Sequence, residues 1–115
     1  MDPDENLALQ LAMNRETFSR LQEMGLKPDT QVQLDFSYIV PGKREASGLA
    51  QLLQSETDYD VEVSSTGTFF TKSWHLEGRT RETPINLPML DQWVRWMVAA
   101  GANHNCQFDG WGTSL

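Results

Sequence analysis

The chain has 115 residues, a formal net charge of −7 and 39% hydrophobic residues. This length suits one domain, and a single cysteine excludes an internal disulfide framework. No apolar run is long enough to span a membrane, and the acidic start differs from a secretory signal, so we expect a cytoplasmic protein. The 16 acidic against 9 basic residues argue against direct binding of nucleic acid and favour a basic protein partner.

The first 25 residues are predicted to form a helix. Asp2 is a suitable cap, and Pro3 occupies a favourable first helical position. Asn14 interrupts the apolar stripe and suggests a kink or a second cap, and Gly25 is a stop signal. The predicted buried face consists of Leu7, Leu11, Phe18 and Leu21.

Residues 31–40 alternate between apolar and polar side chains, which predicts a half-buried strand. Pro41 and Gly42 end it, and the apolar spacing in residues 43–55 predicts a short amphipathic helix. The residues of the strand expected to face the core are Val32, Leu34, Phe36, Tyr38 and Val40.

Residues 59–63 and 69–81 are predicted to form a hairpin of two strands, with a turn centred on Gly67. In its second strand Phe70, Trp74 and Leu76 are expected on the core face. The aromatic side chains are therefore assigned to the core, and the outer face offers no platform for stacking RNA bases.

Asn86 is predicted to cap the last helix and Gly101 to end it. Its buried face is expected to contain Leu90, Trp93, Val94 and Met97. Residues 103–109 then form a final strand, with Cys106 and Phe108 directed inward.

This order predicts an α+β fold, a ferredoxin-like βαββαβ sandwich with an additional N-terminal helix and a four-stranded antiparallel sheet. We expect one domain over residues 1–115, with the N-terminal helix in residues 1–25 and the ferredoxin-like unit in residues 31–112. Right-handed crossovers place both crossover helices on one face of the sheet. The other face is left to the N-terminal helix, a partner or water.

Candidate chemical groups are sparse. His104 and Cys106 form only half of a usual zinc site, and we interpret them as a buried cysteine beside a loop histidine. Asp58, Asp60 and Glu62 indicate a solvated surface, with a weak divalent-cation site as the alternative. Familiar catalytic and phosphate-binding motifs are missing from the sequence. We therefore expect no catalytic residue, no cofactor and no metal.

Two further groups have competing interpretations. Arg79 and Arg81, with Lys72, suit either a solvated, charge-protected sheet edge or a small anion contact. Trp96 lies one step from the buried helical stripe, so it is either a residue that flanks the core or an exposed anchor for a partner.

The most distinctive local feature is the run Asp109, Gly110, Trp111 and Gly112. Two glycines around a tryptophan indicate a backbone that needs positive φ or close approach. In one interpretation Trp111 folds back on the core and Asp109 caps the turn. In the other, the run presents a surface for recognition.

This terminal run, preceded by Phe108, resembles the closing motif of the RraB family, bacterial protein regulators of ribonuclease E. Residues 21–29 resemble that family's lead-in to the first strand, Gln33 to Tyr38 its first core strand, and residues 59–63 a later strand entry, with Asp58 where glycine is common. The resemblance covers roughly residues 14–115. Relatives continue into an acidic tail, whereas three residues follow Gly112 here, so we expect a tail-less member or paralogue.

The resemblance implies a ferredoxin-like, non-enzymatic protein that binds the scaffold region of ribonuclease E and inhibits RNA decay. The residues expected to contact the partner are Asp109, Gly110, Trp111, Gly112 and Trp96. An acidic protein would complement an arginine-rich scaffold. The alternative is a small-ligand sensor, or an interaction module of the same fold with another partner.

Overall fold

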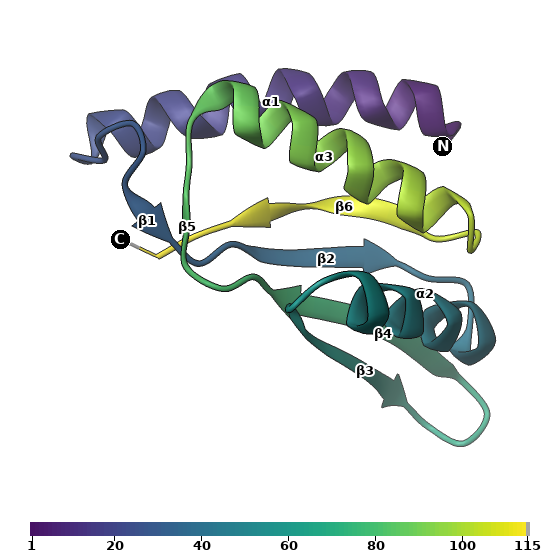
Figure 1. Ribbon diagram of the computed structural model, residues 1–115. Coiled ribbons are helices and arrows are strands. Elements are labelled where there is room, and N and C mark those ends of the chain that lie inside the picture. The colour runs from purple at the N-terminus through teal and green to yellow at the C-terminus, as the bar shows by residue number, and fades with distance from the viewer. Residues whose placement is uncertain (115) are drawn as a thin grey trace.

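Three helices and six short strands make up the chain in the computed structural model, which describes residues 1–114 (Figure 1). None of these three helices is long and apolar enough to cross a membrane. In chain order the elements are α1 (Pro3–Glu23), β1 (Gln31–Val32), β2 (Asp35–Ile39), α2 (Lys43–Glu56), β3 (Asp60–Gly67), β4 (Lys72–Arg79), β5 (Thr83–Pro84), α3 (Leu87–Ala102) and β6 (Gln107–Gly112).

The main sheet has the strand order β3-β4-β2-β6, and every neighbouring pair is antiparallel. Helix α2 connects β2 with β3, which are parallel and have β4 between them. Helix α3 lies in the connection from β4 to β6, which are parallel and have β2 between them. This is the split βαβ arrangement, and it confirms the predicted α+β fold. A second sheet pairs only β1 with β5.

The hydrophobic core lies between α2, α3 and one face of the main sheet. Aromatic rings hold its centre: Phe36 and Trp93 meet edge to face with centroids 6.2 Å apart, and Tyr38 and Phe108 do so at 5.3 Å. Both crossover helices therefore cover the same face, as expected. The opposite face of the sheet carries no helix (Figure 1).

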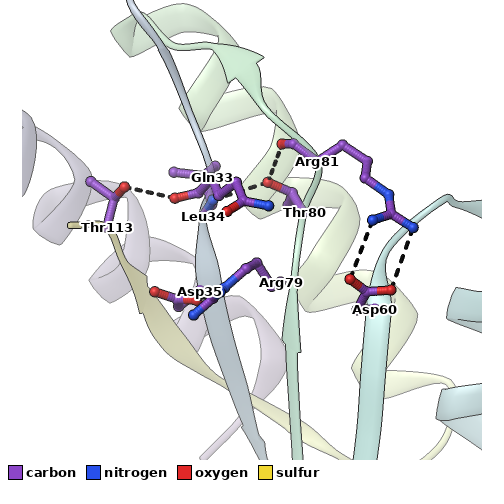
Figure 2. A network of polar contacts seen from close by, with 8 residues as sticks. All are labelled: Gln33, Leu34, Asp35, Asp60, Arg79, Thr80, Arg81 and Thr113. Carbon is purple, nitrogen blue, oxygen red and sulfur yellow. Dashed lines mark hydrogen bonds and ion pairs between the residues drawn. The ribbon is translucent and has the colours of Figure 1, made fainter. Parts of the chain in front are cut away.

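The strand predicted over residues 31–40 is interrupted, because residue 34 bonds to Thr80 instead of continuing the ladder. The Leu34 amide donates to the Thr80 hydroxyl at 3.0 Å, and the Thr80 amide donates to the Leu34 carbonyl at 2.9 Å. Figure 2 shows the contact between Thr80 and Leu34, which lies in the gap between β1 and β2. The predicted inward alternation is retained, since Val32, Leu34, Phe36 and Tyr38 are all buried.

The predicted hairpin turn is displaced. β3 continues through Gly67, and the chain reverses over residues 68–71, so the assignment of Phe70 to the core face is wrong. Phe69 and Phe70 are 86% and 90% exposed and pack edge to face against each other. The tip of the hairpin projects away from α2, so no helix covers it within residues 1–114 (Figure 1).

The last helix and strand also differ from prediction at one boundary. Asn86 caps α3 as expected, accepting from the Met89 amide at 2.9 Å. Gly101 does not end the helix, and a side chain there would collide with the ring of Tyr38, so glycine permits close packing. The final strand begins at Gln107 instead of residue 103 and extends to Gly112.

Helix α1 is unbroken, so the kink or second cap predicted at Asn14 is wrong. Asp2 and Pro3 start the helix as expected. Phe18 and Leu21 are buried as predicted, but in the first half of the helix the buried stripe lies one position before Leu7 and Leu11 and is polar. The stripe consists of Asn6, Gln10, Asn14, Phe18 and Leu21, while Leu7 packs only at the margin of the core.

The polar half of this stripe fastens α1 to α3 and to the edge strand β6. Asn6 and Gln10 both donate to the carbonyl of Phe108, at 3.1 and 3.3 Å. Asn14, which is fully buried, donates to Asp91 of α3 at 3.0 Å and accepts from the indole of Trp111 at 2.8 Å. The amides supply partners that an uncovered sheet edge would otherwise take from water or another chain.

We predict that Asn14→Ala lowers the free energy of unfolding by about 1–3 kcal/mol, because the indole N–H of Trp111 then lacks its buried acceptor. Urea denaturation followed by tryptophan fluorescence measures the change. Gln22→Ala, on the exposed side of the same helix, is the matched control and should change stability little. Equal effects of the two substitutions would contradict this role for Asn14.

Candidate interaction surface

The motif Asp109 to Gly112 lies inside β6, not after it as predicted. Tyr38 of β2 pairs with Phe108, but Ser37 pairs with Gly110, so Asp109 is an extra residue in β6. This is a β-bulge. Gly110 has a φ of 134°, a conformation that side-chain-bearing residues rarely adopt.

The bulge decides where Trp111 points. In a regular strand residues 108 and 111 would face opposite sides of the sheet, because successive side chains alternate. The extra residue restores Trp111 to the core side, where it pairs with Phe36 and lies 6.5 Å from the Trp93 ring. With its bond to Asn14, Trp111 follows the structural interpretation of the motif.

The other side of the motif belongs to the uncovered face of the sheet. Three rows of paired residues cross this face from β3 to β6, and two of them end at glycines of the motif. The first of these two rows is Asp60, Arg79, Asp35 and Gly112, and the second is Glu62, Glu77, Ser37 and Gly110. We call these eight residues, together with Asp109, the open face.

The open face is strongly acidic. It carries five carboxylates, and its one cationic residue, Arg79, donates to Asp35 at 2.6 Å. Arg81, from just beyond β4, reaches back with both terminal nitrogens to Asp60 at 3.3 and 3.4 Å (Figure 2). Arg79 and Arg81, considered above as a small anion contact, thus form ion pairs with carboxylates of the protein itself.

Three carboxylates of the open face have no cationic partner within residues 1–114: Glu62, Glu77 and Asp109. Glu62 and Glu77 are directly paired across β3 and β4. Like charges in this position destabilise a sheet. The open face therefore holds negative charge that the fold itself leaves uncompensated.

A hollow of about 840 Å³ lies over this face. Both rows line it, and Met13 of α1 and Asp109 lie at its margin. On the β6 side it is bounded by glycines, and a Cβ added at Gly112 would meet no atom within 4 Å. The hollow is thus an open, carboxylate-lined surface with space beside β6.

The remaining candidate groups do not assemble into a chemical site. The thiol of Cys106 donates to the backbone carbonyl of His104 at 3.4 Å, so this pair is the buried cysteine and loop histidine of the first interpretation. Residues 1–114 contain no group of three or more His, Cys, Asp or Glu side chains that could hold a metal ion. His75 bonds to Thr66 at 3.0 Å.

Trp96 projects from α3 with 41% of its surface exposed, so it is not a flanking core residue. Because α3 packs on the core side of the sheet, Trp96 and the open face lie on different sides of the molecule. The five residues expected to contact a partner are therefore not one patch.

The open face as a whole was missed by the sequence reasoning. Glu77 was not singled out, and Asp60 and Glu62 were considered only as a local run. The pairing of Glu62 with Glu77 needs the hairpin register, and a turn displaced by a few residues changes that register. The sequence signal that could have revealed the open face was the set of polar side chains that alternate outward along the four strands.

We predict that Gly110→Ala destabilises the protein by about 1–3 kcal/mol, because the added Cβ disfavours a φ of 134°. Gly112→Ala is the matched control, since it lies two residues away, has no positive φ and has free space around it. Thermal unfolding of both variants measures the difference. A loss of stability in Gly112→Ala as large as in Gly110→Ala would refute the bulge argument.

Burial, with a smaller contribution from Glu45, raises the pKa of the Cys106 thiol from 9.0 to about 11. Between these values the unfolded chain releases a proton that the folded chain keeps, so stability falls as the pH rises from 9 to 11. We predict a smaller fall in Tm over this range for Cys106→Ala than for the parent protein. Parallel profiles would exclude Cys106 as a contributor.

Comparison with known proteins identifies the family. The family model described as "Regulator of ribonuclease activity B" matches residues 11–113, nearly the whole chain. A search of curated proteins found no match. The family match agrees with the resemblance carried by the terminal motif. This protein therefore belongs to the RraB family.

Proposed function

We propose that this protein is a non-catalytic regulator that binds the scaffold region of ribonuclease E and thereby inhibits RNA decay. The observation that carries the proposal is the family match over residues 11–113, whose description names regulation of a ribonuclease. The protein would act by occluding or remodelling the scaffold. It performs no chemistry on RNA itself.

The charge distribution supports a protein partner. The chain has a net charge of −7, and its uncovered sheet face leaves three carboxylates unpaired within the described residues. Such a surface repels the phosphates of RNA and attracts a basic protein segment. Regulation through the scaffold protein, not through the RNA, suits this electrostatics.

Two contact sites are compatible with the proposal. One is the open face, through Asp109 and the space beside Gly110 and Gly112. The other is Trp96, whose exposed indole is a typical anchor in protein interfaces. Trp111 contributes indirectly, since it holds α1 in place.

A small-ligand sensor is less well supported. The volume of the hollow falls within the range of small-molecule sites. Those sites, however, are enclosed, whereas this hollow is open, lies on a sheet face that no helix covers within residues 1–114, and has five carboxylates among its lining residues. A basic segment of a protein fits this lining better.

The decisive experiment measures RNA cleavage by purified ribonuclease E, either intact or lacking its scaffold region, with and without this protein. We predict slower cleavage by the intact enzyme only, because binding requires the scaffold. Equal inhibition of both enzymes, or no association with the intact enzyme, would refute the proposal. Trp96→Ala and Asp109→Asn, measured in parallel, separate the two contact sites, since neither side chain is needed for the core.

A further inference from the structure

We propose that the open face is the docking surface and that it takes an extended, arginine- or lysine-rich segment of a partner protein. This inference rests on the proposed function and adds to it the surface and the chemistry of the bound segment. It selects the sheet side of the molecule over the helix side that carries Trp96.

The first argument is that, within residues 1–114, no helix or loop covers this face of the sheet. Helices α2 and α3 lie on the core side, and α1 runs along the β6 edge against α3 (Figure 1). The N-terminal helix, which was one candidate cover for this face, is thus fixed elsewhere by Asn6, Gln10 and Asn14.

The second argument is the pattern of charge. Arg79 and Arg81 already neutralise Asp35 and Asp60 at one end of the face. Toward the middle, Glu62 and Glu77 oppose each other across two strands, and Asp109 protrudes from the bulge of β6. These three groups form an acidic strip that crosses the sheet, and cationic side chains of a partner would relieve its internal repulsion.

The third argument is space. Gly110 and Gly112 place no side chain in the hollow, and the Cβ position of Gly112, which pairs with Asp35, has no atom within 4 Å. A main chain can therefore approach this strand closely while its long cationic side chains reach the carboxylates. Arginine suits this role because its guanidinium forms paired bonds with carboxylates.

The bulge gives Asp109 a specific part in this surface. As the extra residue of β6 it lines the hollow over the open face, and it also lines a smaller neighbouring hollow of about 460 Å³ together with Ser37 and Glu77. A regular strand would place one fewer residue along this edge. The same backbone feature that turns Trp111 inward thus places a carboxylate on the β6 side of the outer face.

The test uses two variants that act on the open face in different ways. Glu62→Gln/Glu77→Gln/Asp109→Asn removes the unpaired charges, and Gly112→Leu fills the free space while retaining every charge. The control Glu5→Gln/Glu23→Gln/Glu56→Gln makes the same change in net charge at exposed positions of α1 and α2. All are measured for binding to the scaffold region of ribonuclease E and to a synthetic peptide of alternating arginine and serine.

We expect the triple open-face variant to bind both probes about tenfold more weakly than the control, with the difference shrinking at high salt. Its Tm should be equal to or a few degrees above that of the parent, because a like-charge pair is removed. Weaker binding with undiminished stability distinguishes a docking role from a structural one. Gly112→Leu should also weaken binding.

The outcomes separate this inference from the proposed function. If the scaffold region binds the parent and the triple open-face variant equally well, the docking surface is wrong and the proposed function stands. If the scaffold region does not bind the parent but the peptide binds in a charge-dependent way, the proposed function fails and the docking surface stands. If neither probe binds the parent, both fail.

Discussion

The bulge at Asp109 and Gly110 is the constraint on which the arrangement of the molecule depends. One extra residue in β6 reverses the alternation of the strand, so that Phe108 and Trp111 both face the core. Trp111 can then reach Asn14 of α1, and Asn14 also binds Asp91 of α3. Without this extra residue, the N-terminal helix would lose its bond to Trp111, which is one of its contacts with the sheet.

Helix α1 in turn supplies hydrogen-bond donors to the exposed edge of the sheet. β6 is an edge strand, and unpaired carbonyl groups at such an edge attract other chains. Amide side chains one helical turn apart satisfy the Phe108 carbonyl. Leucines at these positions could pack there but could not donate hydrogen bonds, which accounts for the polar character of the buried stripe.

The sequence was sufficient for the elements whose signal is local. Strict alternation predicted the inward residues from Val32 to Tyr38, and Asn86 with the spacing from Leu90 to Met97 predicted α3. The polar stripe of α1 was missed because periodicity counts apolar residues only. The amides become meaningful once β6, about 100 residues later, lies beside them.

The open face was also hard to predict, because its residues are distant from one another in the sequence. Its charges come from four strands, and their order in the sheet is a property of the fold. Asp60 and Glu62 looked like an isolated acidic run, yet Glu77 and Asp109 extend it across the sheet. The molecule thus separates its aromatic residues from its carboxylates on the two sides of one sheet. The fold gathers part of the negative charge on one face of the sheet, which the net charge of −7 alone does not reveal.

The contacts of α1 also determine when this helix can dock during synthesis of the chain. The helix leaves the ribosome before the strands of the main sheet, but its bonds to Phe108 and Trp111 span 97 to 102 residues. Until the last strand has been made, its amide stripe has no carbonyl or indole to bind. Non-local contacts of this kind form late in folding. Helix α1 and strand β6 therefore complete this part of the structure together, and only after translation has passed Trp111.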